Sequence, residues 1–329
     1  MKYSCFSGGL VIAWYDYAGR RLKRYLVPVD PALNLLHISH KVYKAWGTGV
    51  PDCGSVEMES KYSEYVKEAL KKCFEKISVM DEQSIRGRVS VNPFGDQTFK
   101  VDRVAEETVL EATRLFFKDA TVVSEESGLM EIGGGGPPFI IVDPVDGSVN
   151  ASRGYPCYSC SIGVAEGESL SDVVCSGVIN LLNGDFYFAE KNHGAFLNGG
   201  RLKASNTERI EEALIAVDLN VRGRLPGYVN RLSRIIEKAR HVRSLGTDAL
   251  EICLVASGAA DAFVDLRGFL RSLDFAAAFL IVREAGGVVL NGEGEDLQVK
   301  LVPVSKSPVV AACSRSLGEE IIRVFKNSG

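Results

Sequence analysis

The stretch FIIVDPVDGSVNASRGYP, residues 139–156, runs an apolar strand directly into two acidic residues, Asp143 and Asp146. Pro144 lies between them. Because proline lacks a backbone N–H and fixes its own φ angle, we expect it to end the strand here. Carboxylate ligands with no Cys or His nearby favour Mg²⁺ or Mn²⁺ over Zn²⁺. The stretch therefore predicts a site for a hard divalent cation.

The residues around these two acids predict further ligands. Val145 can leave its backbone carbonyl oxygen free for a cation, and Gly147 with Ser148 can open a helix whose N–H groups point at an anion such as phosphate. An alternative stays open at this stage. Asp-Pro and Asp-Gly often do no more than form a turn and cap a helix, so Asp143 and Asp146 could have a structural role alone.

Other acidic residues favour the functional interpretation, because each stands at the end of a predicted element, where active-site residues tend to gather. Two of them follow the strand TVVS at 121–124, and two open helices, where a role as N-cap is the usual alternative. These four residues are Glu125, Glu126, Asp102 and Asp274.

The pattern of elements predicts a mixed fold of the α/β (α+β) class. Amphipathic helices are expected from Ser60 to about residue 77 and over 103–118. Two β-hairpins are expected next, SDVVCSGVIN with DFYFAE and AFL with RLKAS, so the first half should contain antiparallel strands. The second half alternates strands and helices, which predicts helices layered on sheets. Its expected elements are ALIAVDL, 226–239, HVRS, 247–257, DAFVDL, 275–285, VVAACS and a terminal helix.

Composition points to a small-molecule partner. The 329 residues are 46% hydrophobic and 24% charged with a net charge of -4, as in a globular protein with an ample core. Because no basic block dominates, nucleic acid and anionic membrane surfaces are not expected partners. We found neither an apolar run of membrane-spanning length nor a signal-peptide pattern, so we expect a cytoplasmic protein. Cys157 and Cys160 have CxxC spacing but lie in a strand-like run, and we expect them to be core residues.

The first 57 residues differ from the rest of the chain. They carry seven Lys or Arg against four Asp or Glu, a net of +3 where the whole chain is -4. We expect residues 1–57 to be an N-terminal extension, either weakly ordered or the product of an over-long gene prediction. Residues 58–329 would then form the main domain, with an α+β half over about 58–205 and an α/β half over about 206–329.

The acidic motifs occur in a familiar order: DQTFKVD at 96–102, SEESG at 124–128, DPVDGS at 143–148 and LDFAAA at 273–278. Together with the segments at 243–265 and 283–289, this order resembles the inositol monophosphatase and fructose-1,6-bisphosphatase superfamily. The resemblance covers about residues 60–329. DLRGFLR at 265–271 looks most like the archaeal branch of this superfamily, whose members act on both inositol phosphate and fructose bisphosphate. The resemblance implies a layered αβαβα sandwich of the sugar phosphatase type, with two sheets and with helices between and outside them.

The resemblance also implies a magnesium-dependent phosphomonoester hydrolase with two or three Mg²⁺ ions, for which Mn²⁺ could substitute. One ion would be held by Glu125, Asp143 and the Val145 carbonyl. A second would be held by Asp143, Asp146 and Asp274, and a third would join at Glu125. Charge on the transferring phosphoryl group would be neutralised by these ions.

The remaining implied roles concern water and substrate. Asp102 and the Ser148 hydroxyl, which stands where the family usually has threonine, would help to deprotonate an attacking water. Gly147 and Ser148 N–H groups would bind the phosphate. Asp265 matches an acid that contacts substrate hydroxyl groups, and Asp248 replaces a small residue beside the sugar. A second phosphate would need a cation, for which the candidates are Arg222, Arg224, Arg267, Arg271 and Lys203.

Three functions stay open from the sequence. The first is hydrolysis of inositol monophosphate, fructose 1,6-bisphosphate or both, as small-molecule phosphate esters. The second is a 3'(2'),5'-bisphosphate nucleotidase or NADP phosphatase, which shares the same acidic residues. The third is a Mg²⁺-binding regulatory protein without catalysis, although this would require a missing ligand. A homodimer or higher homo-oligomer is expected in each case.

Overall fold

The computed structural model describes residues 2–6, 9–15, 21–27, 60–221 and 225–327. The chain divides into two compact units, Met1–Met58 and Glu59–Gly329. In the first unit, strands β1 (Lys2–Phe6), β2 (Gly9–Tyr15) and β3 (Arg21–Val27) form an antiparallel sheet. Residues 28–59 lie outside the described residues, so the expectation of a weakly ordered extension is not tested there. The two units are described separately below.

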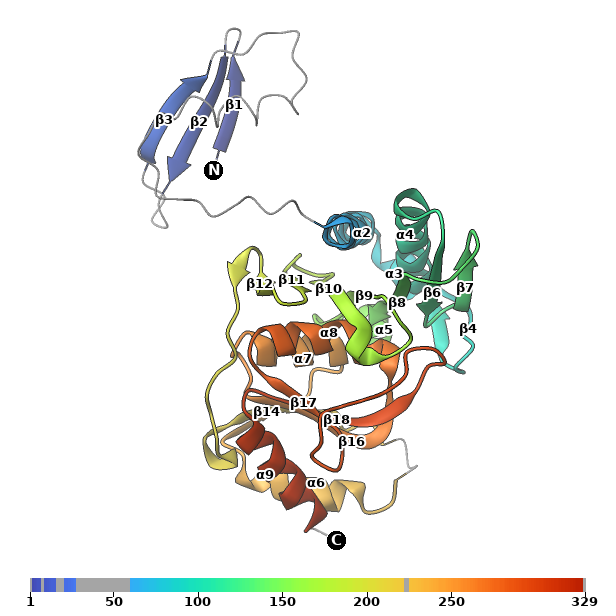
Figure 1. The fold of residues 1–329 in the computed structure, drawn as a ribbon, viewed down its shortest axis with the longest axis vertical. Coiled ribbons are helices and arrows are strands. Elements are labelled where there is room, and N and C mark those ends of the chain that lie inside the picture. Colours follow the sequence, from blue (N-terminus) through green and yellow to red (C-terminus); the bar gives the residue numbers. More distant parts are fainter. Residues whose placement is uncertain (1, 7–8, 16–20, 28–59, 222–224, 328–329) are drawn as a thin grey trace. The chain divides into compact units, whose positions relative to one another are not determined.

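The second unit is built on an eight-stranded sheet and a five-stranded sheet (Figure 1). In the larger sheet β6 and β8 are parallel, whereas the other neighbouring strands are antiparallel. Both predicted hairpins are confirmed, as β10 with β11 and β12 with β13. The strand order of the eight-stranded sheet is β13 (Gly200–Arg201), β12 (Gly194–Leu197), β11 (Phe186–Glu190), β10 (Val173–Asn180), β9 (Ser159–Ala165), β8 (Phe139–Asp146), β6 (Ala120–Ser124) and β7 (Gly128–Ile132).

Two long helices cover the outer face of the eight-stranded sheet, α2 (Lys61–Ser78) and α4 (Lys100–Phe116). Ser60 caps α2 by accepting a hydrogen bond from the Ser63 N–H at 3.1 Å, so this helix starts where the sequence predicts. Its apolar face, including the fully buried Tyr65, packs with α4 and the sheet in one hydrophobic core. Shorter elements complete this half, namely α3 (Glu82–Arg86), β4 (Arg88–Val91), β5 (Gln97–Phe99), α5 (Ser148–Arg153) and a 3-10 turn, η2 (Leu170–Asp172).

The five-stranded sheet belongs to the second half. β14 pairs in parallel with both β15 and β16, whereas β18 pairs antiparallel with β16 and β17. Its order is β15 (His241–Arg243), β14 (Leu214–Val217), β16 (Ala262–Arg271), β18 (Lys306–Ala312) and β17 (Val288–Leu290), preceded by a 3-10 turn, η3 (Ile210–Glu212).

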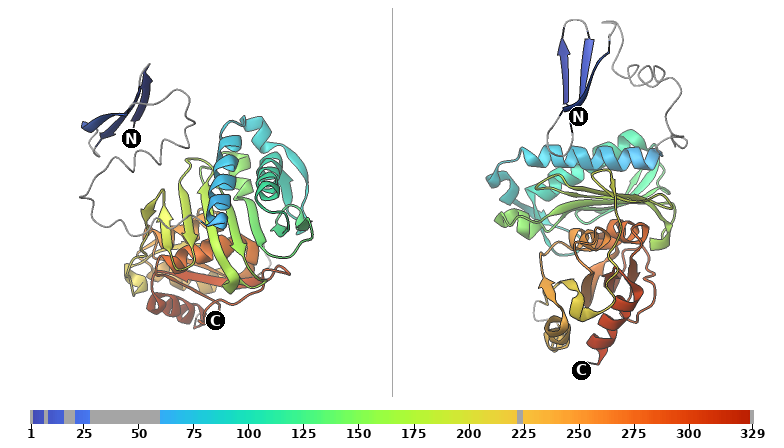
Figure 2. Two further views of the ribbon diagram at one scale, coloured as in Figure 1. Left: turned by 45° about the horizontal axis from the view of Figure 1, so that its top comes forward. Right: turned by 90° about the vertical axis from the view of Figure 1, so that its left-hand side faces the viewer.

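Helices α7 (Asp248–Ala256) and α8 (Ser272–Glu284) lie between the two sheets, and α6 (Tyr228–Lys238) and α9 (Arg315–Lys326) lie outside the smaller one (Figure 2). The alanine-rich face of α8 allows close packing on the larger sheet: a Cβ added at Gly163 of β9 would lie 3.6 Å from the Ala277 nitrogen. The second hydrophobic core surrounds these middle helices. The layered αβαβα fold is therefore confirmed.

Several details differ from the sequence expectations. Pro144 does not end β8, which continues to Asp146; instead, the pairing with β9 shifts register between Asp143 and Asp146, because proline cannot donate to the ladder. β16 likewise continues past DAFVDL to Arg271, with a register shift after Asp265. Helix α4 begins at Lys100 rather than Arg103. The edge strands β7 and β17 were not predicted.

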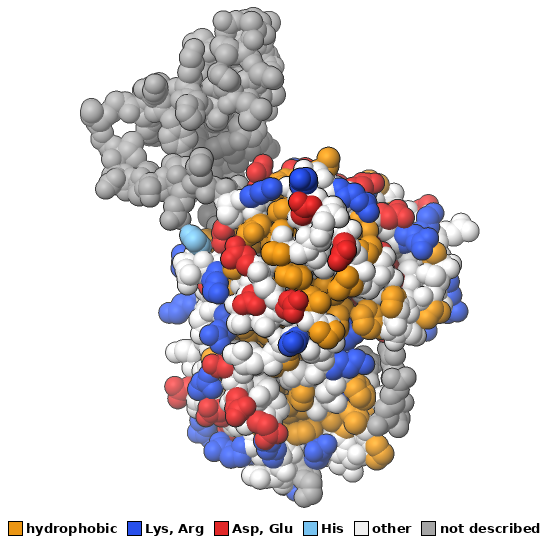
Figure 3. Space-filling view, turned by 45° about the vertical axis from the view of Figure 1, so that its right-hand side comes forward, with side chains coloured by type: hydrophobic (Ala, Val, Ile, Leu, Met, Phe, Trp, Pro, Cys, Tyr) orange, Lys and Arg blue, Asp and Glu red, His pale blue; other side chains and the backbone are white. Residues whose placement is uncertain are grey.

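The described surface is of mixed character. Figure 3 shows acidic and basic side chains interspersed with hydrophobic ones over the face drawn there. Within the described part of the chain, no helix combines the length and the apolar character that a membrane crossing needs. Cys157 and Cys160 are free thiols. Cys160 is fully buried in the first core, as expected, whereas Cys157 is only half-buried and packs against the second core.

A chain that begins at Met58 should fold without the preceding segment, because the described residues of both hydrophobic cores lie beyond it, in the second compact unit. We expect its melting temperature to lie within about 3 °C of that of the full chain. We also expect it to keep the turnover that the family resemblance implies. Calorimetry and a phosphate-release assay on the two chains side by side would check this. Insolubility, or a soluble chain without turnover, would make the first 57 residues part of the functional protein.

Candidate active site

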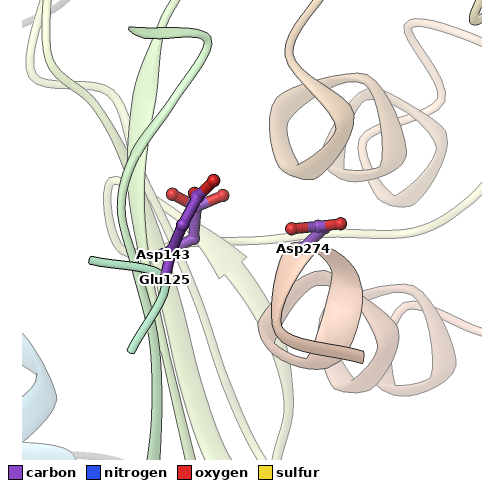
Figure 4. A group of neighbouring side chains, drawn as sticks. All are labelled: Glu125, Asp143 and Asp274. Carbon is purple, nitrogen blue, oxygen red and sulfur yellow. The ribbon is translucent and has the colours of Figure 1, made fainter. Parts of the chain in front are cut away.

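Three carboxylates from distant parts of the chain converge at the junction of the two halves (Figure 4). Glu125 follows β6, Asp143 lies near the end of β8, and Asp274 lies in the first turn of α8. Each offers an oxygen, and these oxygens lie within 4.8 Å of one another. The structure thus brings together three of the predicted metal ligands.

The topology explains this convergence. β6 and β8 are parallel neighbours with Ser124 opposite Val142, so both strands deliver their acids to the same edge of the sheet. The Glu125 N–H extends this pairing by donating to the Val142 carbonyl oxygen at 3.3 Å. Asp274 arrives from the other side, because α8 packs across β8 and β9.

Burial of these like charges makes the group unfavourable when it is fully ionised. Asp143 is only 2% exposed, and its Oδ1 has no hydrogen-bond partner among the described residues. Burial, followed by the charges of Glu125, Asp146 and Asp274, raises the pKa of Asp143 well above its usual value. Burial also raises the pKa of Glu125, to about 7, although Arg271 opposes this shift. Such a group is stabilised by a cation.

Arg271 contacts this acidic group directly. Its Nη2 lies 2.7 Å from Glu125 Oε1, and its Nε lies 3.0 Å from Asp274 Oδ1. The guanidinium also lies over the Phe94 ring, 5.0 Å from its centroid, and 3.7 Å from Asp96. In this structure Arg271, predicted as a substrate ligand, is therefore a counter-ion of two predicted metal ligands.

Asp146 lies beside the group, but its carboxylate is bound by the start of α7. Its Oδ2 accepts hydrogen bonds from the Thr247 hydroxyl at 2.5 Å and the Ala249 N–H at 2.8 Å, and its Oδ1 accepts one from the Asp248 N–H at 3.1 Å. Burial raises the pKa of Asp146 to about 6, whereas the bonds from Thr247 and Ala249 lower it. Asp146 therefore links the larger sheet to the second half of the chain.

Asp102 and Ser148 form the other predicted pair. Asp102 Oδ2 accepts the Phe99 N–H at 2.6 Å, whereas its buried Oδ1 has no hydrogen-bond partner among the described residues. Burial raises the pKa of Asp102 to about 8, and the neighbouring Ser148 hydroxyl lowers it. In this structure that hydroxyl donates to the Val145 carbonyl oxygen at 2.8 Å. The serine thus lies between Asp102 and the predicted carbonyl ligand.

Gly147 makes the tight connection between these residues possible. It has a φ of +89°, a backbone conformation that residues other than glycine rarely adopt. A Cβ there would also lie only 3.2 Å from the Cys157 carbonyl oxygen. Helix α5 starts directly after it, and the first N–H groups of a helix have no partner within the helix.

The predicted polyol contact at Asp265 is already occupied. Arg267 donates from Nε to Asp265 Oδ1 at 2.9 Å and from Nη2 to Asp265 Oδ2 at 2.6 Å, and it also pairs with Asp218. Asp248 lies at the first position of α7. Lys203 is remote, since the adjacent Ala204 bonds to Ala285 beyond the far end of α8, about 16 Å along the helix from Asp274. Arg222 and Arg224 lie outside the described residues.

Sequence reasoning missed several contacts of the site. Asp218 directly follows β14 just as Asp143 follows FIIV, and this shared pattern could have identified it. Thr247 and Asn92 gave no such signal, because their partners Asp146 and Glu125 are distant in sequence.

The comparisons with known proteins agree with this arrangement. The model of the inositol monophosphatase family matches residues 54–329. A fructose-1,6-bisphosphatase/inositol-1-monophosphatase of Thermococcus kodakarensis is 35% identical over 271 residues, which span 82% of this chain and 99% of the relative. A bifunctional NADP phosphatase/NAD kinase of Methanococcus maripaludis is 31% identical over 73% of this chain and 44% of its own.

A solved structure shows the same fold. The extragenic suppressor protein suhB of Bartonella henselae superposes with a TM-score of 0.68 at 28% identity, over 81% of this chain and 99% of that one. The converging acids, the layered fold and the match over most of the chain lead to one conclusion. The chain belongs to the inositol monophosphatase family.

Proposed function

We propose that this protein is a magnesium-dependent phosphomonoester hydrolase that acts on inositol monophosphate, fructose 1,6-bisphosphate or both. The observation that supports it most is the group Glu125, Asp143 and Asp274, three carboxylates held together in a largely buried place. The named function of the archaeal relative agrees with it. The sequence expectations of a cytoplasmic homo-oligomer stay predictions.

The residues present fit a hard divalent cation. The donors are carboxylate oxygens, and the buried Oδ1 of Asp143 lacks the donor or cation that a buried charge requires. The ion would be held by Glu125, Asp143, Asp274 and the Val145 carbonyl oxygen. Asp146 would also bind it, through carboxylate lone pairs that do not accept hydrogen bonds from the start of α7. When bound, Mg²⁺ supplies a Lewis acid that lowers the pKa of water and offsets charge on a phosphoryl group.

The chain's own residues supply the proton acceptor. A general base works best when its pKa lies near the working pH, and the pKa of about 8 at Asp102 is in this range. Its Phe99 bond fixes one oxygen, so the other oxygen remains available beside Ser148. Asp102 would accept a proton through the Ser148 hydroxyl, and the first N–H groups of α5 would orient the phosphate.

An NADP phosphatase or bisphosphate nucleotidase is the second candidate. One relative named as a bifunctional NADP phosphatase/NAD kinase supports it. The three carboxylates alone do not distinguish the two candidate functions, because they would act on the phosphate group, which both classes of substrate contain. The difference must come from the rest of the substrate.

The proposal predicts Mg²⁺-dependent phosphate release from inositol 1-phosphate, fructose 1,6-bisphosphate or both, exceeding release from NADP and 3'-phosphoadenosine 5'-phosphate. Asp143→Asn and Asp274→Asn should each lower turnover at least about a thousandfold. Because Asp143 is buried among like charges and its Oδ1 has no hydrogen-bond partner among the described residues, the metal-free Asp143→Asn variant should melt no lower than the metal-free wild type. Asp274→Asn also weakens the contact with Arg271 and should melt lower. Glu237→Gln, on the exposed face of α6, is the matched control. Near wild-type turnover in a folded Asp143→Asn variant would remove that residue from the site.

Ser148→Ala tests the proton path. We expect turnover to fall about a hundredfold or more with little change in Mg²⁺ affinity, since the hydroxyl donates to the Val145 carbonyl and no charge is lost. Ser148→Thr, which keeps the hydroxyl, should retain most of the turnover. Steady-state kinetics with calorimetric Mg²⁺ titrations would separate the two effects. Equal loss of turnover and of metal affinity would instead indicate a structural role.

The raised pKa values predict how pH affects stability without metal. Asp146, Glu125 and Asp102, with pKa values of about 6, 7 and 8, stay protonated in the folded chain at pH values where the unfolded carboxyls have ionised. Stability should therefore fall as pH rises from about 5 to 8. Because a bound cation removes this penalty, the gain in melting temperature from Mg²⁺ should grow over the same range. A gain that is constant or shrinks with pH would contradict the assignment of these pKa values.

A further inference from the structure

Glu251 is a buried carboxyl group outside the proposed mechanism. It lies in the first turn of α7 and is 0% exposed. Its side chain turns back toward the connection between β15 and α7, where Oε1 accepts the Leu245 N–H at 3.0 Å and Oε2 accepts the Gly246 N–H at 3.1 Å. Both carboxyl oxygens therefore hold the backbone of residues 245–247, which we call the 245–247 loop.

Asn150 of α5 holds the same loop from the opposite side. Its Nδ2 donates to the Leu245 carbonyl oxygen at 2.8 Å and to the Gly246 carbonyl oxygen at 3.2 Å. It also donates to the Cys157 carbonyl oxygen at 2.8 Å, just before β9. The N–H groups of the loop thus bond to Glu251, and its carbonyl oxygens bond to Asn150.

The hydrogen bonds of these two residues are the main restraint on the loop. Leu245 is only half-buried and Gly246 is exposed, so apolar packing fixes little of this backbone. Gly246 also has a φ of +75°, and glycine is the residue with the most conformational freedom to lose. Without its bonds to Asn150 and Glu251, the loop would therefore be free to shift.

Such a shift would reach two groups of the proposed mechanism. The hydrogen bonds that fix the Asp146 carboxylate come from residues 247–249, directly after Gly246. On the other side, a Cβ added at Gly147 would lie 3.3 Å from the Gly246 carbonyl oxygen, so the loop packs against the turn that leads into Ser148. The 245–247 loop therefore connects Asp146 to Ser148.

We propose that Asn150 and Glu251 are positioning residues, which hold the 245–247 loop from opposite sides and thereby set the Asp146 carboxylate relative to the Ser148 hydroxyl. This inference rests on the proposed function, because that function assigns the roles of Asp146 and Ser148. Neither Asn150 nor Glu251 is assigned a contact with the metal ion or the substrate. Groups that orient a metal ligand in this way commonly affect metal affinity or activity by ten- to a hundredfold.

The test uses the full-length wild type, Asn150→Ala, Glu251→Gln and the double variant. We expect each single variant to weaken Mg²⁺ binding, measured by calorimetry on the metal-free protein, by about tenfold. At saturating Mg²⁺, kcat should fall by about tenfold or more, with a smaller change in KM, because Ser148 is also displaced. Since both residues act on one loop, the double variant should lose about as much as the more affected single variant, not the product of the two losses.

Asn291→Ala is the matched control. Asn291 Oδ1 accepts the N–H groups of Glu293 and Glu295 in the turn after β17, so this change also removes side-chain bonds to a loop backbone. It should lower the melting temperature but leave Mg²⁺ affinity and kcat unchanged. Asn150→Ala and Glu251→Gln should differ from it in these two quantities, which a general loss of stability would not change in the folded protein.

Wild-type Mg²⁺ affinity and kcat in folded Asn150→Ala, or losses that multiply in the double variant, would overturn the assignment. If Glu251→Gln does not fold, Asn150→Ala decides alone, because Asn150 is only half-buried. The Mg²⁺ titration needs no substrate, so it tests the loop even if the wild type binds Mg²⁺ but hydrolyses neither inositol 1-phosphate nor fructose 1,6-bisphosphate. That outcome would overturn the proposed function alone, whereas a wild type that binds no Mg²⁺ would overturn both.

Discussion

The electrostatic cost of holding Glu125, Asp143 and Asp274 together is the constraint on which the rest of the site depends. Burial and the neighbouring carboxylates raise the pKa of Asp143 well above its usual value. The folded chain tolerates the group only with protons, a nearby guanidinium or a metal ion as counter-charge. Metal binding is therefore coupled to the protonation and stability of the protein.

The layered architecture provides the framework that opposes this repulsion. Parallel strands β6 and β8 deliver two acids to one sheet edge, and α8 delivers the third from the layer between the sheets. The Asp146 carboxylate joins the two halves by accepting N–H groups from the start of α7. Acids from different layers can thus converge because tightly packed helices hold the sheets at a fixed spacing.

Two arginines in one strand have different roles in this balance. Arg271 contacts two acids of the proposed metal site, so a metal ion bound there would have to share or replace its contacts. Arg267, four residues earlier in the strand, forms ion pairs with Asp218 and Asp265. The pairing of β16 with β18 shifts register between Asp265 and Leu270, a stretch that includes Arg267 but not Arg271. A single strand thereby supplies counter-charge both to the proposed metal site and to the pair Asp218 and Asp265.

The sequence by itself determined the strand that runs into Asp143 and Asp146, the order of the acidic motifs, and the alternation that predicts layered helices and sheets. These features are local or periodic, so they are visible without coordinates. Only the tertiary structure decided that Asp265 is occupied by Arg267, that Arg271 contacts Glu125, and that Pro144 shifts the register instead of ending β8. The tertiary structure also revealed edge strands such as β17, which the local sequence pattern did not predict. Hydrogen bonds and charge pairs between distant residues depend on how the chain packs, and local pattern does not encode that packing.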